Sequence, residues 1–89
     1  MATRTVTIAS SVGLHARPAS LFVEAAADSG LDVEIGRPGE DAVDATSILG
    51  VIALGAMHGE EVVLTAEGAD ADAVLDRLVA LLSTDLDAQ

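Results

Sequence analysis

The sequence predicts an α+β fold, an open-faced two-layer sandwich whose elements follow the order β-α-β-β-α-β-α. Three short segments alternate apolar and polar residues, and two longer segments repeat apolar residues with the period of a helix. Alternation leaves one side of each strand polar, which is typical of an antiparallel sheet with one face in solvent. We therefore expect a four-stranded antiparallel sheet covered on one face by three helices. The 89 residues suffice for one hydrophobic core, so residues 1–89 should form a single domain.

The first strand and the first helix differ in the period of their apolar residues. Residues 4–9 alternate, with Val6 and Ile8 on the same side. Residues 16–30 then follow a helical period, and Gly30 can end this helix in a left-handed conformation. The apolar stripe of the helix consists of Ala19, Phe22, Val23 and Ala26.

The middle of the chain contains a hairpin and a short helix. Residues 31–36 alternate, residues 37–41 (RPGED) have the composition of a turn, and residues 42–45 supply a short partner strand. The apolar segment 46–55 predicts a brief helix that Gly55 terminates.

The last strand and the last helix complete the pattern. Residues 60–67 form the strand, and residues 69–83 form a second long amphipathic helix. Asp70 and Asp72 suit the positive end of the helix dipole. The core-facing residues of the two elements are Val62, Leu64 and Ala66, then Val74, Leu78, Leu81 and Leu82.

The charge of the chain excludes several classes of partner. The chain has fifteen acidic residues and only four arginines, and its formal net charge is −11. No basic stripe for a nucleic acid can be drawn, and anionic membrane surfaces would repel the protein. No apolar run reaches the roughly 18 residues of a membrane span. Without cysteines or a hydrophobic signal segment, the chain is expected in the cytoplasm, with no nucleic-acid partner and no membrane insertion.

One short segment joins a histidine, an arginine and a helix start. Gly13 permits an unusual turn, and Pro18 suits the first turn of a helix. His15 should therefore lie at or near the N-cap, beside the free N–H groups of Ala16 and Arg17. A neutral imidazole can attack phosphorus, while the helix N-terminus and the Arg17 guanidinium bind an anion. The segment therefore predicts phosphoryl transfer.

Other interpretations of the histidines remain open at this point. His15 can instead be only a polar cap, with Arg17 as its solvated neighbour. His58 lies in a connecting segment without an arginine beside it, which favours a solvated loop histidine. Two histidines without the spacing of a metal motif predict no metal site, and nothing in the pattern requires a cofactor.

Two motifs in the right order resemble the signatures of one family. The segment GLHARPAS, residues 13–20, resembles the active-site signature of HPr, the histidine-containing phosphocarrier of the bacterial sugar phosphotransferase system. The segment SILGVIALG, residues 47–55, resembles the second signature of that family, around its regulatory serine. The length, the order of elements and the segment at residues 68–78 are also similar, so the resemblance covers nearly the whole chain.

The resemblance implies a function for the first motif. His15 would be phosphorylated on Nδ1 by phospho-enzyme I, which draws its phosphate from phosphoenolpyruvate, and would pass the group to a sugar-specific enzyme IIA. Arg17, with the N–H groups of Ala16 and Arg17, would steady the phosphate. The protein would then be a stoichiometric carrier rather than a complete enzyme, without a cofactor and as a monomer.

The resemblance also implies roles for the second motif. Ser47 matches a serine that a dedicated ATP-dependent kinase phosphorylates in many relatives, which would add a serine kinase/phosphatase and transcriptional regulators to the partners. Serine at this position is equally a good N-cap for the short helix. Ile48, Leu49 and Ile52 match positions that dock partner proteins, whereas we expect Val51 and Leu54 in the core.

The sequence departs from the family pattern near the predicted site. Val12 replaces a residue that is often polar, and Glu24, Thr46 and Gly50 occupy surroundings where relatives often carry lysines. Either electrostatic steering toward acidic partners is therefore weaker, or the partners of this chain differ in charge. Two alternatives stay open: an interaction domain in which His15 never carries phosphate, and a carrier for a nitrogen-linked relay.

Overall fold

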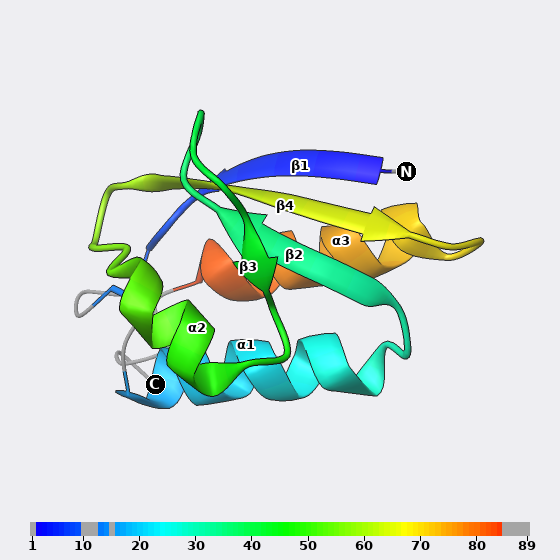
Figure 1. Cartoon of the computed structure of the whole chain (residues 1–89), viewed down its shortest axis with the longest axis horizontal. Coiled ribbons are helices and arrows are strands. Elements are labelled where there is room, and N and C mark those ends of the chain that lie inside the picture. The colour runs from blue at the N-terminus through cyan, green and yellow to red at the C-terminus, as the bar shows by residue number, and fades with distance from the viewer. Residues whose placement is uncertain (1, 10–12, 15, 85–89) are drawn as a thin grey trace.

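Four strands form one antiparallel sheet in the order β1-β4-β2-β3 (Figure 1). The computed structural model describes residues 2–9, 13–14 and 16–84. The strands are β1 (Ala2–Thr7), β2 (Asp32–Gly36), β3 (Val43–Asp44) and β4 (Glu61–Glu67). The central strand β4 pairs with β1 from Ala2 opposite Ala66 to Thr7 opposite Glu61, and with β2 on its other side.

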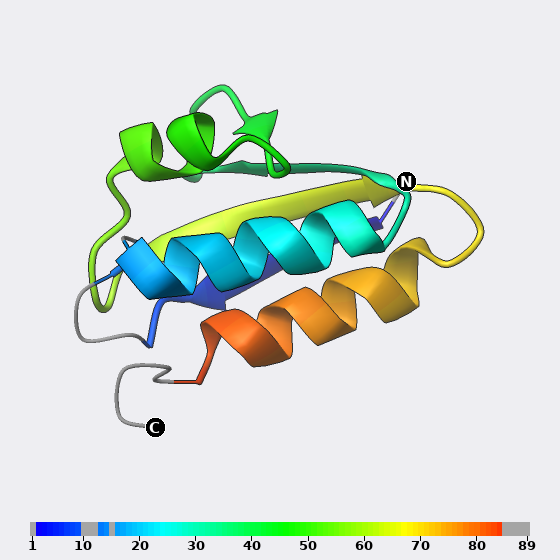
Figure 2. The same ribbon diagram turned by 90° about the horizontal axis from the view of Figure 1, so that it is seen from below.

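The helices lie on one side of this sheet and leave the other side open (Figures 1 and 2). They are α1 (Ala16–Asp28), α2 (Ile48–Leu54) and α3 (Ala71–Leu82). Helices α1 and α3 run roughly along the direction of the strands, and the short α2 packs against α1 near β3. Arg4 of β1 donates hydrogen bonds to Asp72 and Asp76 of α3, which joins an edge strand to the helical layer.

The core lies between the two layers and is almost entirely aliphatic. Inward-facing residues of the strands alternate with exposed ones, as the period of a pleated strand requires. Phe22 of α1 is fully buried among them. The largest other buried side chains are Ile8, Leu14, Ile35, Leu64, Leu75, Leu78, Val33, Val51, Val62 and Pro18.

The predicted order of elements and the two-layer architecture are confirmed. Gly30 and Gly55 have positive φ angles of 73° and 69° at the predicted helix ends. Leu54 is one of four predicted core residues that are only partly buried. It packs only partly against the core, because it occupies the last turn of a seven-residue helix at the side of the molecule. Leu31, Val23 and Leu81 are also partly buried.

Candidate functional site

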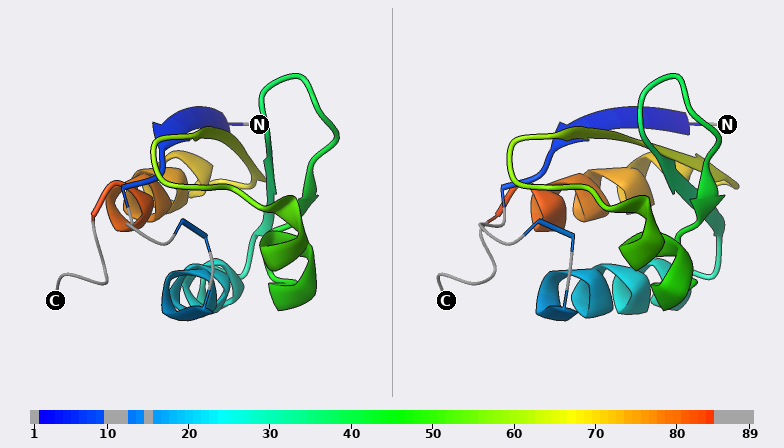
Figure 3. Two further views of the ribbon diagram at one scale, coloured as in Figure 1. Left: turned by 90° about the vertical axis from the view of Figure 1, so that its left-hand side faces the viewer. Right: turned by 60° about the vertical axis from the view of Figure 1, so that its left-hand side comes forward.

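The backbone before α1 is held tightly against the segment between α2 and β4. Gly13 has a φ angle of 74°, and a Cβ atom there would lie 2.4 Å from the Ala56 carbonyl oxygen. The next residue, Leu14, is buried and donates its N–H to the same oxygen over 2.8 Å. Figure 3 shows the backbone of residues 13–14, in blue, beside the start of α1. The turn that sequence analysis assigned to Gly13 is therefore a close contact between two backbones.

Helix α1 begins at Ala16, as the sequence predicted. Arg17 is exposed in the first turn, and Pro18 is buried one position later. Pro18 has no N–H to leave unpaired, whereas the first N–H groups of any α-helix lack acceptors within the helix. This end of α1 therefore presents backbone donors and a guanidinium in adjacent positions. His15 lies outside the described residues, as do Ser11 and Val12.

Ser47 is the N-cap of α2, and its side chain is exposed. Its Oγ accepts a hydrogen bond from the Gly50 N–H over 3.2 Å. The turn before it is fixed by Asp44, whose Oδ1 accepts from both the N–H and the hydroxyl of Thr46. These two hydrogen bonds lower the pKa of the Asp44 carboxyl below its ordinary value. The capping role expected of Ser47 is present.

Helix α2 carries apolar side chains that solvent reaches. Leu49 is 78% exposed and Ile48 is 37% exposed, whereas Ile52 is partly buried and Val51 is fully buried. Met57, just after the helix, is 60% exposed. Sequence analysis did not single out Met57, although a methionine between two glycines of a connecting segment was a visible signal.

A second connection between loops was also missed. Arg37, just after β2, donates to the carbonyl oxygens of Leu54 and Gly55 at the end of α2. It also forms an ion pair with Glu60, which in turn accepts from the Met57 N–H over 2.8 Å. The hydrogen bond from Arg37, and to a smaller extent the one from the Met57 N–H, lowers the pKa of Glu60 below its ordinary value. The same ion pair raises the pKa of Arg37. Neither residue belongs to a sequence motif.

The second histidine, His58, lies in the connection before β4. It is exposed, and its Nδ1 lies 3.2 Å from the Ala9 carbonyl oxygen.

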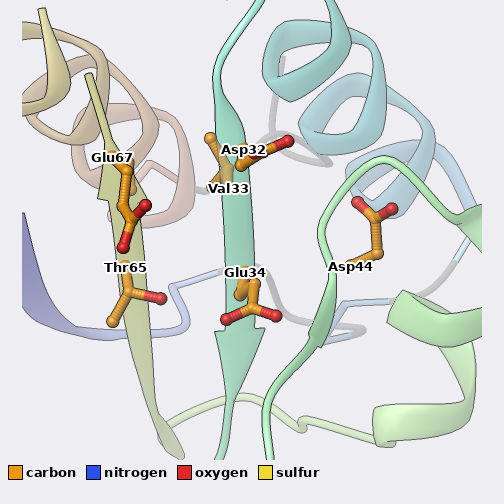
Figure 4. Close-up of a pocket in the computed structure, with 7 residues that line it drawn as sticks. Asp32, Val33, Glu34, Asp44, Thr65 and Glu67 are labelled. Carbon is orange, nitrogen blue, oxygen red and sulfur yellow. The ribbon is translucent and has the colours of Figure 1, made fainter. Parts of the chain in front are cut away.

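A pocket of about 320 Å³ lies on the open face of the sheet, and Figure 4 shows acidic side chains around it. Its lining residues are Asp32, Val33, Glu34, Asp44, Thr65, Ala66 and Glu67.

In the part of the chain that the structure describes, no group of three or more His, Cys, Asp or Glu side chains is arranged to hold a metal ion. Nor does any helix within residues 2–9, 13–14 and 16–84 have the length and hydropathy needed to cross a lipid bilayer.

A family match covers both motifs and all the described elements. Residues 2–84 match the PTS-HPr family model, described as the PTS HPr component phosphorylation site. The chain belongs to the HPr family. Members of this family are phosphocarriers of the phosphotransferase system, so the chain carries a phosphoryl group rather than completing a catalytic cycle alone. A place in such a relay implies partner proteins.

Relatives and solved structures agree with this assignment. The phosphocarrier protein HPr of Haloferax volcanii is 55% identical over 82 residues, covering 91% of this chain and 92% of that protein. HPr of Streptomyces coelicolor is 45% identical over 87 residues, covering 98% and 94%. The crystal structure of HPr-C-His from Thermoanaerobacter tengcongensis has a TM-score of 0.86 at 38% identity, covering 92% of this chain and 91% of that one. A structure described as an HPr dimer from the same organism has a TM-score of 0.68 at 38% identity, covering 91% and 92%.

Proposed function

We propose that His15 is the phosphoryl acceptor of this HPr-family chain. Phospho-enzyme I, charged by phosphoenolpyruvate, donates the group to Nδ1 of a neutral imidazole. The N–P bond formed there breaks when the histidine of a sugar-specific enzyme IIA attacks the same phosphorus. The carrier thus returns to its starting state after each transfer.

One observation carries this proposal: helix α1 begins immediately after residue 15 in the chain. Its first turn holds Arg17, exposed to solvent, and the backbone N–H groups of Ala16 and Arg17. These donors favour an anion at the helix start through their hydrogen bonds and through the helix dipole. Because phosphoryl transfer needs mainly positioning and charge stabilisation, this arrangement supplies what the reaction requires of the protein.

Labelling from phosphoenolpyruvate tests the acceptor directly. Incubation with enzyme I should give an acid-labile, base-stable phosphoprotein, and His15→Ala should give none. We expect Arg17→Gln to slow labelling by about tenfold to hundredfold, because it removes a donor to the transferred group. Arg77→Gln makes the same charge change at an exposed position of α3 and should label normally. Labelling of the His15→Ala variant at the wild-type rate would refute the proposal.

We also propose regulation through Ser47 and docking through α2. The Ser47 hydroxyl is exposed and within a helix cap, so a serine kinase can reach it, and a phosphatase can restore it. A phosphate there would add about two negative charges beside the exposed Ile48 and Leu49. With Ile52, these form the surface that we assign to enzyme I, enzyme IIA and transcriptional regulators. Labelling by ATP and such a kinase should be absent in Ser47→Ala.

The remaining assignments concern the whole chain. We propose that residues 1–89 form one HPr-like domain that acts in the cytoplasm as a monomer. One related structure is described as an HPr dimer, so sedimentation at micromolar concentration is the decisive measurement. A sedimentation coefficient of a dimer would overturn this part. Transfer of the label to sugar-specific enzyme IIA, rather than only to a member of a nitrogen-linked relay, tests the choice of relay.

A further inference from the structure

We infer that Arg37, through its ion pair with Glu60, is a positioning residue for the phosphoryl-acceptor segment. This inference rests on the proposed function, because it assigns Arg37 a part in the reaction at His15. Arg37 lies after β2 and belongs to neither signature motif. It acts through the segment 55–60, which contacts the backbone just before α1.

The Arg37 guanidinium joins three parts of the chain. Its Nε donates to the Leu54 carbonyl oxygen over 3.2 Å, and its Nη2 donates to that of Gly55 over 2.8 Å. Its Nη1 and Nη2 both face the carboxylate of Glu60. The end of α2 and the residue before β4 are therefore held by one planar group, whose fork of donors a lysine cannot reproduce.

Glu60 extends this connection into the segment that contacts the site. Its Oε1 accepts from the Met57 N–H over 2.8 Å, and its own N–H donates to the Met57 carbonyl oxygen over 3.0 Å. Residues 57–60 thus form a closed turn with the Glu60 side chain across it. The end of β1 also holds this turn, since Ile8 accepts from the Gly59 N–H and donates to the Glu60 carbonyl oxygen.

The same segment sets the backbone before the proposed acceptor. Ala56 accepts from the Leu14 N–H, and its oxygen lies only 2.4 Å from the position that a Cβ of Gly13 would take. Displacement of Ala56 should therefore disturb Gly13 and Leu14, since a hydrogen bond and a close contact join the two backbones. These two residues precede His15 in the chain, and Ala16 begins the helix that follows it.

Small displacements at this point matter for the reaction. Transfer requires the attacking nitrogen in line with phosphorus, and a misplacement of about 1 Å can cost about a hundredfold in rate. Arg37 acts through the segment 55–60 rather than by contact with the transferred group. Its loss should slow the transfer step more than it weakens docking to enzyme I through α2, because Ser47 and Gly55 still cap that helix.

The experiment compares Arg37→Gln and Glu60→Gln, singly and together, with Arg77→Gln as the control for charge. Labelling by phospho-enzyme I gives kcat and KM with this chain as substrate. Amide hydrogen exchange by NMR follows Leu14 beside the site and Leu64 in β4. A further variant, Arg37→Lys, keeps the charge without the fork.

We expect Arg37→Gln to lower kcat by about tenfold with little change in KM, and to speed exchange at Leu14 but not at Leu64. The double variant should be no slower than Arg37→Gln, because both residues act as one unit. Arg37→Lys should recover only part of the rate. If Arg37→Gln does not fold, Glu60→Gln and Arg37→Lys are compared with the wild-type chain by the same rate and exchange measurements.

Two results would overturn the inference. One is wild-type kcat and Leu14 exchange in Arg37→Gln; the other is equal acceleration at Leu14 and Leu64, which indicates a general loss of stability. If the wild-type chain takes no label at all, the proposed function fails instead. Exchange at Leu14 then still decides whether Arg37 positions this segment.

Discussion

At the residue scale, Gly13 shows how one missing side chain brings two distant segments together. Its φ angle of 74° is unfavourable for other residues, and the Ala56 oxygen lies only 2.4 Å from the position of the missing Cβ. Gly39, in the β2–β3 turn, has a similar φ angle of 80° but no atom within 4 Å of the corresponding position. Substitution of Gly39 by alanine therefore costs only the unfavourable backbone conformation, whereas substitution of Gly13 also costs a steric clash.

The first prediction uses this pair. Gly39→Ala should lose about 1–2 kcal/mol of unfolding free energy, because only its backbone conformation is penalised. Gly13→Ala should lose more, about 3 kcal/mol or above, because the Ala56 and Met57 backbones must also move. Urea unfolding followed by circular dichroism measures both. Equal losses in the two variants would mean that the contact between Gly13 and Ala56 is not tight in solution.

Sequence reasoning reached part of this residue-scale description. The GLHARPAS motif predicted the turn at Gly13, the start of α1 and the exposed Arg17, because each depends on residues close in sequence. It did not predict that Ala56 accepts from Leu14, since that contact joins residues from separate elements. The hydrogen bonds of Arg37 were missed for the same reason, because their acceptors at Leu54 and Gly55 lie far along the chain.

At the scale of elements, the short helix α2 depends on what holds its ends. A helix of seven residues is too short to be stable by its own hydrogen bonds. Ser47 caps its first turn, and Gly55 ends it with a φ angle of 69°. Arg37 then supplies donors to the carbonyl oxygens of Leu54 and Gly55. The caps were predictable from sequence, whereas the guanidinium was not.

The second prediction concerns the response of this end of α2 to acid. Because the pKa of Glu60 is lowered in the folded state, its carboxylate stabilises the fold above the unfolded value of about 4.5. This contribution is lost as pH falls through the lower, folded pKa. Glu60→Gln should therefore be less stable than wild type near about pH 7, and the difference should shrink below about pH 4.5.

Unfolding by urea at a series of pH values measures this difference. Glu24→Gln, on an exposed position of α1, controls for the loss of one negative charge. A difference between Glu60→Gln and wild type that stays constant down to about pH 3 would contradict the prediction, since below about pH 4.5 the unfolded wild-type chain binds a proton at Glu60 more readily than the folded chain does.

At the scale of the whole molecule, the two faces of the sheet have opposite characters. The inner face is apolar and covered by helices, and its alternating pattern made the architecture predictable. The open face carries acidic residues at opposite positions of neighbouring strands: the register pairs Asp32 with Glu67 and Glu34 with Asp44. Figure 4 shows these side chains on the same face. The sequence gives the net charge of −11 but not these pairs, because strand register decides which acids meet.

Like charges directly opposite in a sheet destabilise it, so this face should make folding depend on salt. The Asp44 carboxyl stays ionised to a lower pH than an ordinary carboxyl, because hydrogen bonds from Thr46 lower its pKa. Raising sodium chloride from about 0.01 M to 1 M shortens the screening length from about 30 Å to 3 Å. The unfolding midpoint of the wild-type chain should therefore rise with salt.

The third prediction assigns that rise to the two carboxylate pairs. Asp32→Asn with Glu34→Gln removes one charge from each pair, and should raise the midpoint at low salt while flattening its dependence on salt. Glu24→Gln with Asp41→Asn removes the same net charge from exposed positions of α1 and the β2–β3 turn that belong to neither pair. Because salt also strengthens apolar burial in every variant, only the difference between the two double variants is informative. Equal salt dependences would show that net charge, rather than the cross-strand pairs, governs the response.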